Sequence, residues 1–368
     1  MNRIEDKLRE VAAGGAASSS KIQDMLWNFG RWLNDEDEYS DVIISSRIRL
    51  ARNIKGFPFP HKASDTELAK ILEKARHACS KCKSLSSARY LDIRKLSDWD
   101  CKYFVERRLA SPQFVESERP SLLVVGPQEN ISVMVNEEDH LRIQCIEAGL
   151  GVKEAWRKVR TLDDELEDNL NFSFSNKFGY LTACPTNIGT GMRVSAFVHL
   201  PGLSMKEEIE SFMRKLPSSE VAVRGFYGEG TESIGSIFQI SNQLTLGRTE
   251  ENVISRMLQT AKELIARERD ARDKLLKSDR IRIEDTVYRA LGILQNARII
   301  SSLEAIKLLS TLRFGRELGL IEDFSRIALN QLMVLVQPAH LQKIYNRDMN
   351  AEERDIFRAE FIRQNLEI

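Results

Sequence analysis

Five arginines lie on segments whose alternation of polar and apolar residues predicts β-strands. In His140–Cys145, for example, alternation places Arg142 on the face opposite Leu141 and Ile143. The same reasoning predicts outward-facing arginines on three further segments, so that one wet sheet face would carry Arg47, Arg49, Arg142, Arg193 and Arg224. Each arginine alone is more simply explained as a solvated strand residue, and only the arrangement on four strands favours a binding site.

A cluster of this kind calls for an anion of high charge, because guanidinium groups repel one another unless an anion binds between them. Arginine presents a rigid fork of donors that suits phosphate oxygens, and it stays charged. A nucleoside triphosphate is therefore the obvious candidate. The chain has no G-x-x-x-x-G-K-[ST] loop and no glycine-rich loop followed by H-R-D, so arginine side chains would bind the phosphates. Catalysis would then consist of positioning and charge stabilisation of the transferred phosphoryl group.

Two carboxylate features accompany the arginines. Acidic residues of Asn136–His140 directly precede Arg142, and the glycine-punctuated loop Gly225–Gly230 holds Glu229. A carboxylate cannot help to bind phosphate, so we expect it to hold a cationic acceptor and take its proton as a general base. The simpler alternative for the acidic run is a solvated turn.

Composition limits the class of protein. Lys and Arg together number 54, as do Asp and Glu, and this balance argues against a broad surface for nucleic acid or anionic membrane. Five cysteines in 368 residues do not form a disulfide framework. Cys79 and Cys82 form a C-x-x-C near His77, but no second ligand pair stands at a spacing that suits zinc. No apolar run reaches transmembrane length and no secretory signal is evident, which predicts a cytoplasmic location.

The order of the segments predicts an α+β fold. Strand-like runs such as Leu122–Val125 and Ile131–Val135 continue to about Gly247 without the spacing of βαβ units, which favours an antiparallel or mixed sheet flanked by helices. Beyond Gly247 the patterns are helical, and one helix is expected to end at Pro338. We therefore expect an antiparallel sheet with helices packed on it, followed by an all-helical C-terminal domain.

Four segments resemble the catalytic motifs of the phosphagen (guanidino) kinases. They occur in the family's order across about 41–271, and the CPTN sequence at the start of the third is highly specific: Ser45–Asn53, Asn136–Arg142, Cys184–Arg193 and Arg224–Glu229. Two further features resemble the bacterial protein arginine kinases of this family. The large N-terminal helical domain of the small-substrate enzymes is replaced by a short segment, and Arg354–Ala359 resembles an RDxxRA motif.

The resemblance implies a division of the chain and a set of site residues. It implies an N-terminal extension (1–40), a phosphagen-kinase-type catalytic domain (41–271) and a helical domain for dimerisation and phosphoarginine sensing (275–368). Glu138 and Glu229 would clamp the substrate guanidinium, and Cys184 would be the reactive thiol beside it. The residues implied to bind ATP are Ser45, Ser46, Arg47, Ile48, Arg49, Arg108, Arg142, Arg193, Val194, Ser195, Ala196, Phe197, Arg224, Gly225, Phe226, Tyr227, Gly228 and Glu229. Those implied to form an allosteric phosphoarginine site are Arg354, Asp355, Arg358 and Ala359.

Two of the implied roles, nucleotide binding by Arg108 and phosphoarginine binding by Arg354 and Arg358, compete with other interpretations of the sequence. Arg108 stands where the family often has a nucleotide-contacting histidine. Arg354 and Arg358 lie one helical turn apart and could together grip one phosphoryl group, but a surface helix with charge pairing explains the same pattern.

The expected activity is transfer of a phosphoryl group from ATP to arginine in proteins, with Mg²⁺ held mainly by phosphate oxygens and water rather than by protein ligands. The resemblance also implies a homodimer that works with an McsA-type activator, the CtsR repressor and the Clp protease system. Two alternatives stay open: a kinase for a small guanidino compound such as free arginine, and a regulatory protein that binds phosphoarginine. The replaced N-terminal domain speaks against the first, and the intact glutamates and arginines speak against the second.

Overall fold

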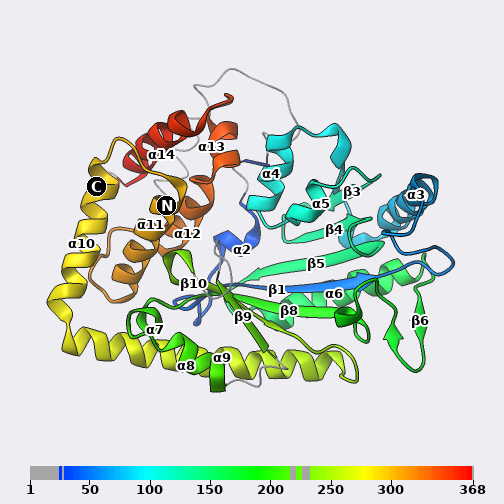
Figure 1. The fold of residues 1–368 in the computed structure, drawn as a ribbon, viewed down its shortest axis with the longest axis horizontal. Coiled ribbons are helices and arrows are strands. Elements are labelled where there is room, and N and C mark those ends of the chain that lie inside the picture. The colour runs from blue at the N-terminus through cyan, green and yellow to red at the C-terminus, as the bar shows by residue number, and fades with distance from the viewer. Residues whose placement is uncertain (1–24, 27–28, 216–220, 226–232, 367–368) are drawn as a thin grey trace.

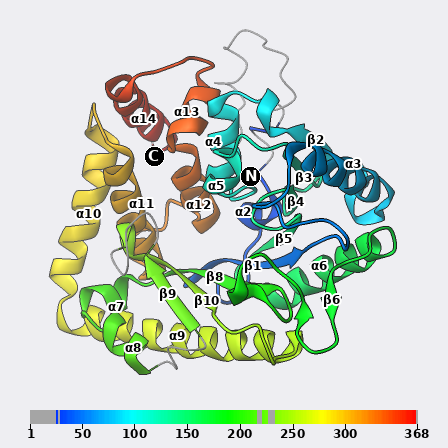
Figure 2. The same ribbon diagram turned by 45° about the vertical axis from the view of Figure 1, so that its right-hand side comes forward.

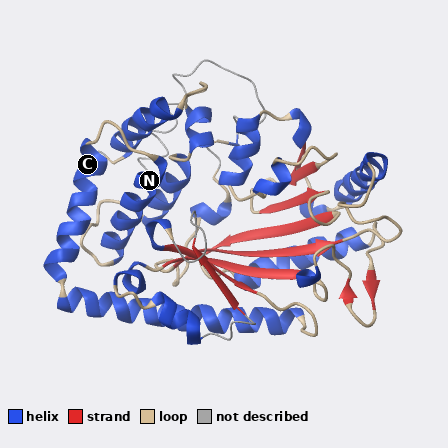
Figure 3. Cartoon of the chain, viewed as in Figure 1, coloured by secondary structure: helices blue, strands red, loops and turns tan. Residues whose placement is uncertain are grey.

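The computed structural model describes residues 25–26, 29–215, 221–225 and 233–366. An antiparallel sheet of eight strands lies at the centre, helices flank it, and the C-terminal part of the chain is entirely helical (Figures 1 and 3). This confirms the expected α+β class with an antiparallel sheet and a helical C-terminal region.

The sheet has the order β2-β3-β4-β5-β1-β8-β10-β9, and each neighbouring pair is antiparallel. Its strands are β1 (Ile43–Arg52), β2 (Arg89–Asp92), β3 (Leu122–Val125), β4 (Ile131–Val135), β5 (Leu141–Ala148), β8 (Met192–His199), β9 (Val221–Gly225) and β10 (Ile237–Asn242). β1 pairs with β5 on one side and with β8 on the other, so the first motif lies between the second and the third. A separate hairpin is formed by β6 (Phe174–Ser175) and β7 (Gly179–Tyr180).

Three helices cover one face of the sheet and bury its apolar residues. They are α3 (Asp65–Lys81), α6 (Val152–Glu167) and α9 (Glu250–Ser278). Ile48 of β1 pairs with Cys145 and Val194, and all three side chains are buried in the core that these helices share. Because successive strand residues point to opposite faces, the alternate residues of β1 face the other way.

The opposite face meets a second core that contains the C-terminal helices. The remaining α-helices are α2 (Arg31–Asn34), α4 (Asp98–Glu106), α5 (Pro112–Val115), α7 (Pro201–Met205), α8 (Ile209–Lys215), α10 (Arg280–Asn296), α11 (Ser302–Glu317), α12 (Arg326–Leu335), α13 (Pro338–Ile344) and α14 (Ala351–Asn365). Short 3-10 turns occupy Lys83–Leu85, Ile93–Lys95, Pro185–Asn187 and Ile234–Ser236. The second core joins Trp32, Phe104 and Phe197 to apolar residues of α10 to α14. α9 runs along the sheet and turns directly into α10, which leads to the other C-terminal helices (Figure 2).

The structure corrects the expected role of Pro338. The helix that this proline was expected to end is α12, which already ends at Leu335, and Pro338 lies in the first turn of α13. Proline is well tolerated there because the first backbone N–H groups of a helix have no intrahelical acceptor. No described helix is long and apolar enough to cross a membrane.

Candidate active site

The sheet register brings the predicted arginines together on one face. Arg49 of β1 lies directly opposite Arg193 of β8, and Arg142 of β5 pairs with Ala51, two residues further along β1. On the other side of β8, Gln239 of β10 pairs with both Phe197 and Arg224. Residues that pair directly share a face of the sheet. The arginines of all four strands, Arg47 included, therefore face away from the core beneath α6 and α9.

These arginines form a concentration of positive charge in which, among the described residues, Arg142 alone forms ion pairs with carboxylates. Burial, followed by the charges of Arg142 and Arg193, lowers the pKa of Arg47 to about 10. Burial lowers the pKa of Arg193 as well, and the nearby charges of Arg224 and Arg142 lower it further. Within the described part of the chain, the buried Nε of Arg49 has no hydrogen-bond partner. The face is thus arranged to receive an anion, which would relieve the repulsion and satisfy the donors.

Two hollows meet at this arginine cluster. One, of about 210 Å³, is lined by Glu138 and Cys184 together with Arg49, Arg142 and Arg193. The other, of about 380 Å³, has an apolar side formed by Val105, Ala110, Met134 and Phe197 and a charged side formed by Arg47, Arg49, Arg108 and Arg142. Since Arg49 and Arg142 line both hollows, the cluster lies between the hollow that contains Glu138 and the hollow with the apolar side. We call these the acceptor hollow and the nucleotide hollow.

The acidic turn supplies two carboxylates with different environments. Glu137 is buried and accepts hydrogen bonds from Nη1 of Arg142 at 2.5 Å and from Oγ of Ser111 at 2.6 Å. Glu138 is 44% exposed, with Oε2 3.5 Å from Nη2 of Arg142. Burial, followed by the charge of Asp139, raises the pKa of Glu138 above its usual value. Glu137 therefore orients Arg142, and Glu138 is the carboxylate that remains accessible in the acceptor hollow.

Asp139 joins three parts of the site. Its Oδ1 accepts hydrogen bonds from Nδ2 of Asn53 at 2.6 Å and from the backbone N–H of Ala183 at 2.7 Å. This fixes the segment before Cys184 against the acidic turn, so Cys184 and Glu138 line one hollow. Sγ of Cys184 lies 3.0 Å from Oγ1 of Thr186. The amino-acid sequence does not distinguish the roles of Glu137 and Asp139 from that of Glu138, because these roles depend on burial and on hydrogen-bond partners.

Not all residues implied to bind ATP have side chains at the hollows. Ser46, Ile48, Val194 and Ala196 are buried with side chains on the opposite face of the sheet, and Oγ of Ser46 donates to the carbonyl of Gly149. The hydroxyls of Ser45 and Ser195 lie on the arginine face: Ser45 accepts from Nη1 of Arg108 at 3.5 Å and Ser195 donates to the carbonyl of Arg47 at 3.4 Å. Gly225 ends β9, and Phe226, Tyr227, Gly228 and Glu229 lie outside the described residues.

The residues implied to sense phosphoarginine lie on α14 and line neither hollow. Arg358 is 1% exposed, and its Nε and Nη1 donate to the carbonyls of Val336 and Ile300, each at 2.8 Å. Asp355 also pairs with Arg358, and Ala359 is buried. Arg354 is less buried, donates to the carbonyl of Met349 at 2.7 Å and lies 5.6 Å from the ring centre of Trp99. Arg358 thus has a structural role in this arrangement, whereas Arg354 is the more accessible of the two.

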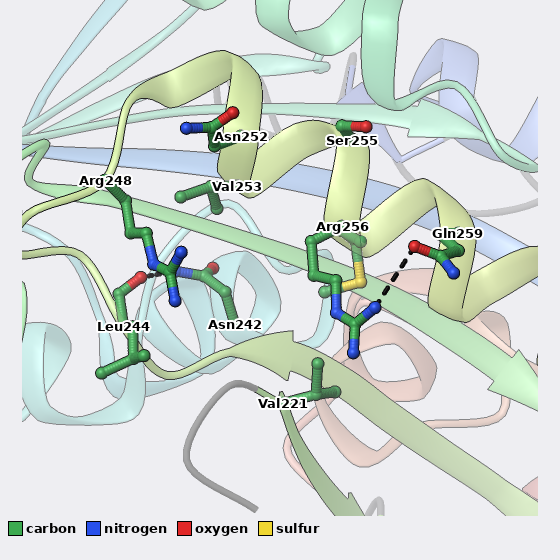
Figure 4. Close-up of a pocket in the computed structure, with 10 residues that line it drawn as sticks. Val221, Asn242, Leu244, Arg248, Asn252, Val253, Ser255, Arg256 and Gln259 are labelled. Atoms are coloured by element: carbon green, nitrogen blue, oxygen red, sulfur yellow. Dashed lines mark hydrogen bonds between the residues drawn. The ribbon is translucent and has the colours of Figure 1, made fainter. Parts of the chain in front are cut away.

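The C-x-x-C pair and a cavity beside α9 contain none of the implied site residues. Cys79 and Cys82 are buried, and burial raises the pKa of each thiol to about 12. Across the described ranges no cluster of three or more His, Cys, Asp or Glu is placed to hold a metal ion. A cavity of about 320 Å³ lies between α9 and the β9–β10 end of the sheet, with Val221, Leu244, Arg248 and Arg256 among its lining residues (Figure 4).

Known proteins of similar fold and sequence define the class. Residues 70–271 match the family described as ATP:guanido phosphotransferase, C-terminal catalytic domain. The duplicated taurocyamine kinase from Schistosoma mansoni has a similar structure, with TM-score 0.57 and 23% identity, over 72% of this chain and 38% of that one. Lombricine kinase aligns with TM-score 0.56 and 21% identity, over 72% of this chain and 76% of that one. The fold is that of the guanidino kinases.

The sequence comparison is more specific. Residues 280–368 match the family described as Protein-arginine kinase McsB C-terminal domain. A protein-arginine kinase of Clostridium acetobutylicum is 43% identical over 337 residues, which cover 91% of this chain and 99% of that protein. A protein-arginine kinase of Pelotomaculum thermopropionicum is 44% identical over 338 residues, covering 91% and 95% respectively. The chain belongs to the protein-arginine kinase family.

Proposed function

We propose that this chain transfers the γ-phosphoryl group of ATP to the guanidinium of arginine side chains in proteins. The observation that carries the proposal is the position of Arg49 and Arg142, which line both the hollow with an apolar side and the hollow that contains Glu138. A nucleotide base suits the apolar hollow, phosphates suit the arginines, and a cationic acceptor suits the hollow that contains Glu138. The membership of the chain in the protein-arginine kinase family supports the choice of acceptor.

The arginine cluster fits a triphosphate. Arg47, Arg49 and Arg193 lie side by side on β1 and β8, and Nε of Arg49 is a buried donor with no partner among the described residues. Bound ATP would supply the phosphoryl group, and Mg²⁺ is expected to be held mainly by its phosphate oxygens and water. The guanidinium groups would orient the phosphates and stabilise the charge that develops during transfer. Glu137 assists by holding Arg142 in place.

The acceptor needs a base because a free guanidinium is protonated and a poor nucleophile. Glu138 has an accessible carboxylate in the acceptor hollow, where it would orient the guanidinium and accept its proton. The family resemblance implies that Glu229 holds the same group, and Cys184 lines the hollow beside Glu138. Together these residues would align one guanidinium nitrogen with the phosphoryl group between the two hollows.

The family resemblance also supports proposals about the partners of this chain and about its regulation. The chain would act in the cytoplasm as a homodimer with an McsA-type activator, on substrates that include the CtsR repressor and in concert with the Clp protease system. Arg354, Asp355, Arg358 and Ala359 would belong to a phosphoarginine-sensing site separate from the hollows.

The direct test offers Mg-ATP with either an arginine-rich unfolded protein or free arginine. Mass spectrometry under non-acidic conditions then shows which acceptor gains acid-labile phosphate. We expect the protein acceptor to be phosphorylated at arginine in preference to the free amino acid. Phosphorylation of free arginine alone would instead support a small-molecule guanidino kinase, and phosphate on neither acceptor would contradict the proposal.

A further inference from the structure

The end of α4 joins the nucleotide hollow to the C-terminal helices through three consecutive residues, Glu106, Arg107 and Arg108. Glu106 reaches α13, where its carboxylate accepts the backbone N–H groups of Ala339 at 2.8 Å and His340 at 3.0 Å. Burial raises the pKa of Glu106 to about 8, while these two N–H groups act in the opposite direction. The carboxylate thus holds the first turn of α13 against the end of α4.

His340 lies between Glu106 and Arg107 and bonds to both. Nε of Arg107 donates to Nε2 of His340 at 3.1 Å, which makes Nε2 the acceptor. The ring proton must therefore be on Nδ1, which donates to Glu106 at 2.6 Å. Burial and the charge of Arg107 lower the pKa of His340, in keeping with a neutral ring. The three side chains fix one another's orientation.

Arg107 is completely buried and also holds the N-terminal part of the described chain. Its Nη2 donates to the carbonyls of Met25 at 2.9 Å and Leu26 at 3.0 Å. A movement of α13 relative to α4 would therefore disturb a network of buried hydrogen bonds, which is costly in a low-dielectric interior.

The next residue, Arg108, lies in the nucleotide hollow. Its backbone φ is +60°, a left-handed conformation that is uncommon for a residue with a side chain. The guanidinium carbon lies 3.1 Å from the ring centre of Phe197, and the carbonyl accepts a hydrogen bond from Gln144 at 2.8 Å. The direction of this side chain therefore depends on how the end of α4 is held, and the preceding two residues hold it.

We propose that Glu106, Arg107 and His340 are positioning residues, which hold Arg108 over the nucleotide hollow so that α13 sets the affinity for the nucleotide. Glu106 lines the same hollow as Arg108. A single residue, Arg107, therefore separates the contact with α13 from the side chain that would contact the nucleotide. The inference rests on the proposed function, because it takes the apolar hollow as the site of the ATP base.

The experiment is a double-mutant cycle in the full-length chain. His340→Phe keeps a ring of similar size but removes both side-chain hydrogen bonds, and we expect ATP to bind about tenfold more weakly. KM for ATP should rise, while KM for the protein acceptor stays the same. In an Arg108→Ala background, His340→Phe should cause no further loss. Equal losses in both backgrounds would show a general structural effect and would overturn the inference, as would an unchanged ATP affinity.

Three further variants make the result decisive. Glu106→Gln keeps the size of the side chain and provides the same test if His340→Phe does not fold. Lys343→Gln is the matched control, because Lys343 of α13 pairs with Asp100 at the other end of α4, and its loss should leave ATP binding unchanged. Arg193→Ala tests the nucleotide site itself. If Arg193→Ala weakens ATP binding and the His340 and Glu106 variants do not, only the inference fails; if Arg193→Ala has no effect, the proposed function fails.

Discussion

Arginines occur in two contrasting environments in this protein. At the junction with the C-terminal helices, Arg313 is buried among protein acceptors: its Nη2 donates to the carbonyl of Ser40 at 2.6 Å, and its Nε donates to Asn330 at 3.1 Å. On the sheet face, the side-chain hydrogen bonds of Arg47 and Arg193 to other described residues go to amide oxygens alone, those of Gln239 at 3.3 Å and Asn187 at 3.4 Å.

The difference separates structural charge from charge reserved for a ligand. A buried arginine whose donors are satisfied stabilises the fold, and its removal leaves carbonyl groups without partners. An arginine beside other arginines lowers the stability of the fold until an anion binds. Functional sites commonly reduce stability in this way. The two groups therefore predict opposite responses to the same substitution.

The largest expected effect follows from Arg193→Ala. Because one guanidinium fork serves both binding and transfer, we expect turnover to fall by about 10²–10³-fold with weaker ATP binding. Arg193→Lys should restore only part of the activity, since an ammonium cannot bind two oxygens in the same planar way. Arg193 lies beside the charges of Arg224 and Arg142 and donates one long hydrogen bond, to Asn187 at 3.4 Å, so thermal unfolding of Arg193→Ala without ATP should be unchanged or shifted upward. A lysine variant equal to the wild type would refute the bidentate argument.

Glu138→Gln tests the carboxylate opposite the arginine cluster. The amide keeps the size of the side chain but cannot accept the guanidinium proton, so turnover should fall by roughly 10²-fold or more. ATP affinity should change little. Kinetics with a protein acceptor and equilibrium ATP binding separate these quantities. Full turnover in this variant would remove Glu138 from the mechanism.

Arg313→Ala should instead destabilise the fold, because His199 and the carbonyls of Ser40 and Asp41 lose a buried partner. We expect the free energy of unfolding to fall by about 3 kcal/mol, measured by denaturant titration. Arg282→Ala is the control: Arg282 is 85% exposed and 3.9 Å from Asp279, so its change should stay within about 0.5 kcal/mol. Similar losses in both variants would contradict the division into two environments.

Arg354 and Arg358 extend the comparison to α14. Arg354→Ala should leave ATP affinity intact but weaken the binding of free phosphoarginine, and with it any activation by that ligand, whose coupling to the active site is expected to be about 1–3 kcal/mol. Arg358→Ala should lower the stability of the fold, because Arg358 holds the carbonyls of Val336 and Ile300. Calorimetric titration with phosphoarginine and thermal unfolding measure the two effects. An unchanged response in Arg354→Ala would make this residue part of a solvated helix face.

The smallest effect concerns pH. Burial and Asp139 raise the pKa of Glu138 above its usual 4.5, and only the deprotonated carboxylate can accept a proton. Turnover should therefore rise with pH through a pKa above 4.5, by up to about tenfold per pH unit on the acidic limb. The pH–rate profile of the wild type measures this limb, and Glu138→Gln should lack it. If Glu138→Gln still shows the acidic limb of the pH–rate profile, then a group other than Glu138 causes the pH dependence.

The strand pattern could be predicted well because alternation is a local signal. Leu122–Val125 and Ile131–Val135 are β3 and β4 with the expected bounds, and the arginine face of β1, β5 and β8 follows from the same periodicity. The environment of each charged residue could not be predicted. The sequence of α14 does not show that Arg358 is one of the most buried side chains, because its burial follows from tertiary packing; its role in sensing phosphoarginine stays a prediction.

The same limit applies to the acidic turn and to the junction. Glu137 and Glu138 are adjacent and identical in type, and only the contacts of Arg142 and Ser111 distinguish the orienting residue from the accessible one. His340 lies 233 residues from Arg107, so no local pattern connects the two. Hydrogen bonds at such separations follow from the fold and have no periodic signature.

The anchoring of β1 has a consequence for biosynthesis. Asp41 stands just before this central strand; its carboxylate pairs with Arg269 of α9 at 2.6 Å, and its carbonyl accepts from Arg313 of α11, which is 272 residues away. The strand that carries Arg47 and Arg49 is thus translated early, whereas Arg269 and Arg313, which hold the residue before it, leave the ribosome late. Contacts of such separation are slow to form because a long loop must close first. The nascent chain must wait until α11 has emerged before its central strand is fully anchored.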